Sequence, residues 1–412
     1  MPTARRSTSW WRTRCVGRRS PARSATPCRS ALPLPKSAAA SGGVAAKSRR
    51  PAAESSPVDF DRVRAIVAQE LAPLATRIDL EGYYPEGVLH ALGAAGAYAA
   101  HVTAAAGDGH LWDGVRAIAS VAEECGATAF CMWCQDACAW YLAVTPNESL
   151  RAQYLAPVAS GEQLGGTALS NPMKAFAGIE TIRLKGRKVK GGYRVSGQVP
   201  FVSNLGRGHV FGAILGTDDG SHVMALLDTD MEGVKAGQRA QFVALDGTRT
   251  WAVSLHDCFV PDARVLAAPA EALVPKIRPT FILLQNGLAT GLMRDCLAMI
   301  ARAGRSLGHV NRYLPEQAEP IAEALEKLER ETEALCATPL ATDRDYIRRV
   351  LQSRIDAGDW AIKAAHTAML HLGARGYVRT ARAQRRLREA YFVAILTPAG
   401  KHLRKDLAAL DG

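Results

Sequence analysis

The chain has 412 residues, of which 48% are hydrophobic and 22% charged, a composition typical of a globular protein with more than one packed unit. Its formal net charge of +12 comes from residues 1–53, which hold 12 of the 51 Lys and Arg residues and no acid, so 39 basic residues face 39 acidic ones in the remainder. Because the rest of the chain is neutral, we do not expect it to bind nucleic acid. No apolar run reaches the roughly 20 residues that a membrane-spanning helix needs.

Residues 1–55 are rich in Arg, Ser, Ala and Pro and show no apolar period, so we expect a disordered basic leader. Such a composition resembles an organelle transit peptide. The alternatives are translated upstream sequence and a tail that binds nucleic acid or acidic lipid. The expected location is cytoplasmic, or an organelle matrix if the leader is a transit peptide. After the leader we expect three domains, which span residues 56–160, 161–265 and 266–412.

The first of these domains is predicted to be helical. Ser56 can cap its first helix, Pro57 suits the first helical position, and apolar residues recur at helical spacing from Val63 to Leu74. The next three helices are expected over residues 85–99, 112–125 and 127–142.

Three cysteines lie on one face of the last of these helices. Cys131, Cys134 and Cys138 do not have the spacing of zinc or iron–sulfur ligands, so we interpret them as buried thiols and propose no metal site. With nine cysteines in a chain of this length, a reducing compartment is the default.

From Gly161 the apolar period changes to two. Consecutive strands without helices between them predict an antiparallel barrel or sandwich. Gly206, Gly208 and Gly212 resemble a dinucleotide-binding loop, but a strand follows them where that loop needs a helix, so we predict a turn. The strands are expected over residues 181–185, 193–196, 209–215, 222–227, 242–245 and 251–259.

The helical period returns near residue 278 and predicts a C-terminal four-helix bundle with a short helix after Pro398. Five arginines between Arg379 and Arg388 indicate a solvated or subunit-interface face, with a phosphate contact as the alternative. An Ala stripe from Ala361 to Ala368 suggests a close-packing surface between subunits. The bundle helices are expected over residues 279–304, 315–336, 343–372 and 381–396.

The predicted fold class is therefore α+β and multidomain, with a helical domain, an antiparallel sheet and a helical bundle in that order. Several local strings occur within this order at characteristic spacing, and together they resemble the acyl-CoA dehydrogenase family of flavoproteins over residues 58–410. The strings span residues 106–109 with 121–125, 154–162, 165–172, 193–204, 258–261, and 372–377 with 388–389.

The resemblance implies an FAD at the junction of sheet and bundle, with an acyl thioester of CoA or an acyl carrier lying against the flavin ring. The implied cofactor-binding residues are Leu169 and Ser170, which match the family's flavin-contacting string, and Phe201 and Ser203, which match its aromatic cover and its hydroxyl near flavin N5. A reduced flavin gains negative charge, which hydroxyl donors stabilise. The resemblance also implies a homodimer or homotetramer, with no nucleic-acid partner and no membrane span.

The catalytic residues remain unassigned, because both positions at which the family places its carboxylate base differ. Thr397 and Ile277 occupy them, and neither side chain can accept a proton from carbon at neutral pH. Leu370 and Ala374 also depart from the family at contacts that a neighbouring subunit makes to FAD. Straight-chain dehydrogenation is expected to be slow unless another group supplies the base. Three interpretations follow, namely a dehydrogenase with a relocated base, a flavin monooxygenase-like relative, and a non-catalytic member.

Overall fold

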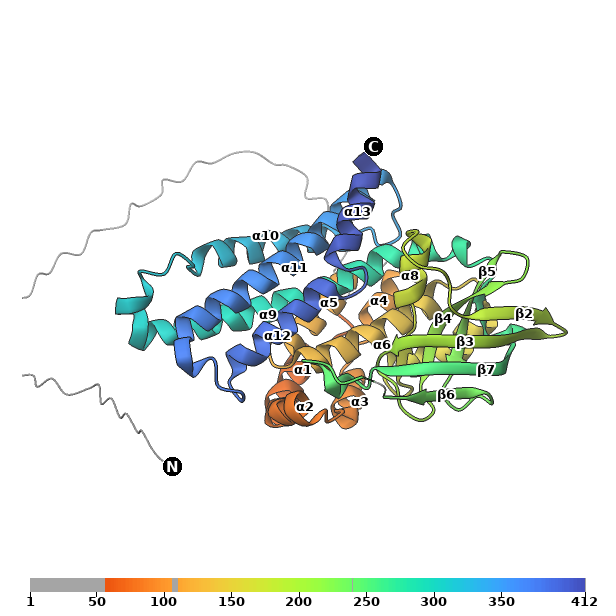
Figure 1. Ribbon diagram of the computed structural model, residues 1–412, viewed down its shortest axis with the longest axis horizontal. Helices are drawn as coiled ribbons and strands as arrows, with labels where there is room; N and C mark the ends of the chain where they lie inside the picture. The colour runs from red at the N-terminus through yellow and green to blue at the C-terminus, as the bar shows by residue number, and fades with distance from the viewer. Residues whose placement is uncertain (1–55, 106–109, 239, 412) are drawn as a thin grey trace, which may run out of the picture. The chain divides into compact units, whose positions relative to one another are not determined.

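Helices occupy both ends of the described chain and a sheet occupies its middle (Figure 1). The computed structural model describes residues 56–105, 110–238 and 240–411, so the predicted leader lies outside the described residues. None of the helices in the described ranges combines the length and apolar character that a bilayer crossing requires.

The four predicted N-terminal helices are present, but the helices over residues 75–81, 100–104 and 148–159 were not predicted, and Asp59 rather than Ser56 caps the first helix. The first is interrupted by a π-helical turn at Val67–Leu71, and Asp59 caps its start by accepting from the Arg62 N–H at 2.9 Å. The helices are α1 (Phe60–Ile66), α2 (Ala75–Glu81), α3 (Glu86–Ala94), α4 (Ala100–Ala104), α5 (Leu111–Ala122), α6 (Gly126–Val144) and α7 (Glu148–Ala159).

The three cysteines of α6 are fully buried thiols, as predicted. Among the described residues, no group of three or more His, Cys, Asp or Glu side chains is arranged to hold a metal ion.

The sheet is mixed, which refines the expected antiparallel arrangement. β1 and β2 both run parallel to β4, and the remaining named pairs are antiparallel. The parallel pairs arise because a short helix, α8 (Ser170–Phe176), follows β1 and carries the chain back, and the sequence pattern did not reveal it. The strands are β1 (Gly165–Thr167), β2 (Lys185–Val189), β3 (Gly192–Val202), β4 (Val210–Thr217), β5 (His222–Asp228), β6 (Val234–Gly237), β7 (Trp251–Pro261) and β8 (Val265–Ala267).

Two predicted strands are wrong. Residues 242–245 form an irregular segment, and the edge of β7 that such a strand needs is occupied by β6. Residues 181–184 precede β2 instead of forming part of it. The glycine-rich stretch is confirmed as a turn, since Gly206 and Gly208 lead directly into β4.

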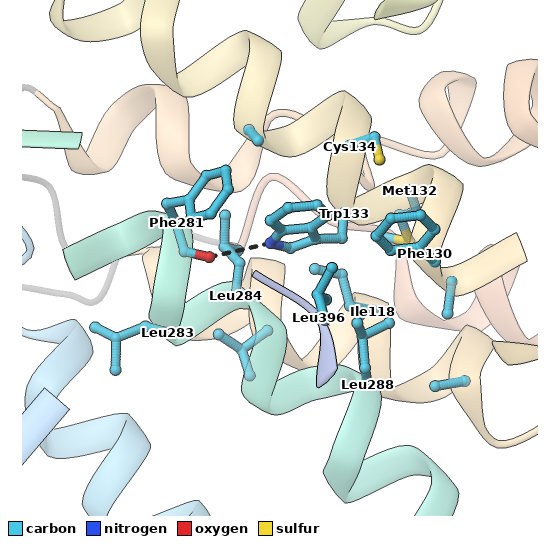
Figure 2. Close-up of a cluster of buried hydrophobic side chains, with 14 of the residues drawn as sticks. Ile118, Phe130, Met132, Trp133, Cys134, Phe281, Leu283, Leu284, Leu288 and Leu396 are labelled. Carbon is cyan, nitrogen blue, oxygen red and sulfur yellow. Dashed lines mark hydrogen bonds between the residues drawn. The ribbon is translucent and has the colours of Figure 1, made fainter. Parts of the chain in front are cut away.

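The C-terminal helices pack on the N-terminal ones through a shared apolar core, while the sheet has a core of its own. In the shared core, the ring of Trp133 from α6 meets Phe281 of α9 edge to face, and its indole N–H donates to the Phe281 carbonyl at 3.1 Å (Figure 2). The C-terminal helices are α9 (Val274–Asn311), α10 (Glu319–Cys336), α11 (Arg344–Leu372), α12 (Arg382–Ile395) and α13 (Gly400–Asp411).

Two expectations about the bundle surface need correction. The Ala stripe on α11 is buried within the chain's own core, so it offers no surface to a second subunit. Arg385 and Arg386 are also buried, because α12 faces inward here and its guanidinium groups pair with carboxylates of this chain. Arg386 bonds Asp295 at 2.7 Å and Glu389 at 2.6 Å, which leaves no role for it as a solvated or phosphate-binding side chain.

Candidate functional site at the junction of sheet and bundle

The structure brings Ser170 and Thr397 together, although 227 positions separate them in the sequence. Ser170 is the first residue of α8, and Thr397 lies in the loop between α12 and α13. Their hydroxyl oxygens are 3.1 Å apart and share a hydrogen bond. A residue predicted to contact the flavin therefore meets one of the two positions where the family places its base.

The loop that carries Thr397 is held by the interior of the bundle. Gln285 of α9 donates to the Thr397 carbonyl at 2.9 Å and accepts from the Arg354 guanidinium of α11 at 2.7 Å. Arg354 also donates to the Val393 carbonyl. Complete burial lowers the pKa of Arg354 to about 10. This chain of hydrogen bonds fixes the loop against α8.

The side chain of Leu169 takes no part in the candidate site. The side chain is fully buried in the apolar core, and the Leu169 N–H donates to the Thr167 hydroxyl at 3.3 Å. That hydroxyl in turn shares a hydrogen bond of 2.8 Å with the Tyr141 hydroxyl from α6. The segment that leads into α8 is thereby anchored to the helical domain.

Ser203 lies at the end of β3, opposite Thr167 in an isolated antiparallel bridge. Its side chain is 7% exposed, and its hydroxyl shares a 2.7 Å hydrogen bond with Thr250. Thr250 continues to Thr248 at 2.8 Å. Ser203 is therefore one end of a chain of three hydroxyls, whose other end, Thr248, is anchored by donating to the Leu245 carbonyl.

Phe201 precedes Ser203 by two residues on the chain, and its aromatic ring is exposed. Its side chain is 46% exposed, and its ring centre lies 6.0 Å from that of Phe242. The two rings border a pocket of about 250 Å³, which Arg183, Gln198 and Thr250 also line. We call this the Phe201 pocket.

A second pocket, of about 320 Å³, lies where α8, the start of α9 and α13 meet. Met173 and Phe176 of α8 and Val274 of α9 give it an apolar wall. Its polar wall consists of Arg278, His402 and Asp406. We call this the α8–α13 pocket.

Neither usual base position carries a proton acceptor, but a carboxylate lies close by. Ile277 is fully buried, whereas Asp406 contacts Arg278 and lies 3.1 Å from Nε2 of His402. Burial alone would raise the pKa of Asp406, yet its contacts with His402 and Arg278 hold that pKa below its usual value. Sequence reasoning passed over this pair, although its i,i+4 spacing on a predicted helix was a usable signal.

The residues present fit a flavin in their chemistry. Phe201 offers an exposed ring for an aromatic cofactor, the hydroxyls of Ser170 and Ser203 can donate to a reduced ring, and Arg183 beside Phe201 suits a phosphate. Ser170 is the first residue of α8 and Ser203 bridges Thr167 at the end of β1, so both hydroxyls belong to the short β1–α8 segment or pair with it.

Helices, sheet and helices that meet at such a junction define the acyl-CoA dehydrogenase fold. Residues 60–162 match the model of the acyl-CoA dehydrogenase N-terminal domain. YngJ, a probable acyl-CoA dehydrogenase of Bacillus subtilis (strain 168), is 23% identical over 357 residues, which cover 81% of this chain and 92% of that protein. The chain is thus similar to acyl-CoA dehydrogenases over most of its length, and its N-terminal helical region matches the N-terminal domain of that family.

Two solved structures illustrate the range of proteins that share the fold. Butyryl-CoA dehydrogenase from Megasphaera elsdenii matches with a TM-score of 0.76 at 16% identity, over 85% of this chain and 96% of its own. Dibenzothiophene monooxygenase (TdsC) from Paenibacillus sp. A11-2 matches with a TM-score of 0.71 at 16% identity, over 85% and 95%.

Proposed function

We propose that the protein is an FAD-dependent oxidoreductase that acts on the CH–CH group of an acyl thioester. The observation that carries this proposal is the Ser170–Thr397 contact, which joins the sheet to the bundle loop beside the α8–α13 pocket. FAD, when bound, supplies an acceptor for the hydride that leaves the substrate.

The residues of this chain would hold and orient the reactants. Phe201 would cover one face of the flavin, and the hydroxyls of Ser170 and Ser203 would donate to its polar edge. The backbone of Leu169, whose N–H donates to Thr167 and whose carbonyl accepts from Met173, would position Ser170 for this contact. Donors fixed in advance in this way stabilise charge without reorganising during the reaction.

The α8–α13 pocket suits a short acyl group, because its apolar wall is limited to a few side chains and its volume is about 320 Å³. The thioester would be presented by CoA or by an acyl carrier. We also propose that the protein forms a homodimer or homotetramer, on the strength of the family alone, and works in the cytoplasm, or in an organelle matrix if the leader is a transit peptide.

An absorbance spectrum of the purified protein tests the cofactor, and anaerobic addition of butyryl-CoA and longer acyl-CoA thioesters tests the reaction. We expect a bound yellow flavin that bleaches with short acyl-CoA and more slowly with long ones. Protein that contains no flavin and takes up none when FAD is added would overturn the proposal.

A flavin monooxygenase-like activity is the second candidate. It is favoured by Thr397 and Ile277, since activation of O₂ by reduced flavin needs no base at the substrate α-carbon, and a monooxygenase shares the fold. Flavin that stays yellow with every acyl-CoA, together with faster O₂ consumption by the reduced protein when an aromatic or amine substrate is added, would select this activity. A bound flavin that supports neither reaction would select the non-catalytic alternative.

A further inference from the structure

We infer that His402 accepts the α-proton of the bound thioester and that Asp406 orients its ring, an inference that rests on the proposed function. His402 would replace the carboxylate that is missing at Thr397 and Ile277. It is a catalytic residue in this proposal, whereas Asp406 and Arg278 are positioning residues.

His402 is a buried imidazole that lies next to a carboxylate. Its side chain is 4% exposed and lines the α8–α13 pocket, and its Nε2 lies 3.1 Å from Oδ2 of Asp406. Asp406 is itself held by Arg278, at the start of α9. Within the described part of the chain, both ring nitrogens of His402 are buried and neither makes a hydrogen bond of good geometry, and what distinguishes them is the proximity of Nε2 to Asp406.

These contacts assign a role to each ring nitrogen. A carboxylate beside Nε2 stabilises the tautomer that carries its proton there, so the lone pair remains on Nδ1. A buried nitrogen without a partner costs free energy, and a ligand in the adjoining pocket can remove that cost. The apolar side chains of Met173 and Phe176 on the opposite wall suit the carbon atoms of an acyl group.

The other groups near the pocket are poorer proton acceptors. The carboxylate of Asp406 is paired with Arg278, which lowers its basicity, and its pKa lies below the usual value. The Thr397 hydroxyl is shared with Ser170 and is a very weak base. Among the side chains that line the pocket, His402 is the one with a nitrogen lone pair that can accept a proton.

The proposed step is a proton transfer and needs no oxidant. The bond between the α-carbon and its hydrogen breaks, and an N–H bond forms at Nδ1 of His402. The electron pair of the broken bond moves toward the thioester carbonyl and gives an enolate. The imidazolium that results carries a positive charge 3.1 Å from Asp406, which stabilises it.

This step can be measured without oxidation of the substrate. Acetyl-CoA has α-hydrogens but no β-carbon, so it cannot be dehydrogenated. The protein, as purified with its flavin, is incubated with acetyl-CoA in D₂O, and deuterium in the acetyl group is followed by mass spectrometry. We expect exchange above the uncatalysed rate, and a loss of about 10²-fold or more in His402→Gln.

Three further variants sharpen the test. Asp406→Asn should slow exchange less than His402→Gln, because it removes only the orienting group. Free imidazole should restore exchange to His402→Ala, which a structural role for His402 would not allow. His366→Gln, which changes an exposed histidine on α11, should exchange like the unaltered protein.

The outcomes separate this inference from the proposed function. If butyryl-CoA still bleaches the flavin but His402→Gln exchanges and bleaches as fast as the unaltered protein, His402 is not the base and the proposed function stands. If calorimetry finds no binding of acetyl-CoA or butyryl-CoA and neither exchange nor bleaching occurs, the proposed function fails, and the role of His402 fails with it.

Discussion

At the scale of single residues, the hydroxyl of Ser203 gives the most direct test of where a flavin binds. Ser203→Ala removes one donor from the chain that runs through Thr250. A buried hydrogen bond of this kind contributes about 1 kcal/mol, so we expect roughly fivefold weaker retention of FAD, measured by ultrafiltration. Ser196→Ala, on the same strand but away from the junction, should retain FAD normally.

Phe201→Ala extends this prediction to the exposed ring. Loss of an aromatic face should also weaken FAD retention, because the ring would no longer cover the cofactor. Equal retention in Ser203→Ala, Phe201→Ala and the Ser196→Ala control would contradict the placement of the flavin.

Part of the candidate site could be predicted from the sequence and part could not. The strings around Ser170 and Ser203 resemble family motifs, and in the structure Ser170 contacts Thr397 while Ser203 pairs with Thr167, but their contact with a flavin stays a prediction. The role of Leu169 was less accessible, since the sequence does not show that its side chain points into the core. His402 and Asp406 escaped attention because their significance depends on Arg278 from another helix, a contact that no local pattern contains.

At the scale of helices and strands, the start of α6 is tied to α12 through Glu389. The Gly126 N–H donates to the Glu389 carboxylate at 3.1 Å, and a Cβ added at Gly126 would lie 2.8 Å from the carboxyl carbon. Arg386 holds that carboxylate in place, so it cannot move aside. We expect Gly126→Ala to lower the free energy of unfolding by about 1–3 kcal/mol.

A second glycine provides the matched control. Gly304 lies inside α9, is exposed, and has nothing within 4 Å of the position of an added Cβ. Gly304→Ala should raise the free energy of unfolding by about 0.5–1 kcal/mol, through helix propensity alone. Urea titrations measure the free energy of unfolding of both variants. Destabilisation of similar size in both would contradict the steric argument.

The arginines of α12 predict how stability depends on pH. Burial alone would raise the pKa of Asp295, but Arg386 and Arg382 hold it below its usual value. Because the folded pKa is lower than the unfolded one of about 4, the stabilisation is complete above that value and is lost as the pH falls through the folded pKa.

Asp295→Asn should remove this part of the acid dependence. At neutral pH it should cost about 3–5 kcal/mol, because the buried guanidinium group of Arg386 and the partly exposed one of Arg382 lose a partner. Asp359→Asn is the control, since its pair with Arg404 is exposed on both sides. Urea unfolding measured between pH 3 and 7 should show a flatter acid limb only for Asp295→Asn, and parallel curves for all forms would refute the assignment.

Predictions of individual strands from the sequence failed where they depended on which strands pair with each other. Residues 242–245 are apolar and suit a strand, but β6 already pairs with that edge of β7, and Leu245 adopts a left-handed backbone conformation. Likewise, period-two patterning cannot show that a seven-residue helix follows β1 and makes two pairings parallel. Long helices were easier to predict, because their apolar stripes extend over many turns.

At the scale of the whole molecule, we expect residues 1–55 to be dispensable. They contain a single acid, Glu54, and show no apolar period, so we expect them to contribute no surface to a packed core. A chain that starts at Ser56 should have the same melting temperature and flavin content as the full chain. Calorimetry and absorbance of the two forms test this, and a large loss of either property in the shorter form would contradict it.

The contact between α12 and the end of α5 has a consequence for cutting the chain in two. Arg382 reaches Glu124 at 2.8 Å, and Glu389 accepts from the first residue of α6, so each side of the molecule carries the counter-charges of the other. If the backbone were nicked between β8 and α9, Arg386 would keep Asp295 and Glu389 within its own fragment, but Glu124 would lose Arg382 and the Gly126 N–H would lose Glu389. The two fragments, produced together, should therefore bind each other. The chain could then be used as a split protein that assembles by fragment complementation.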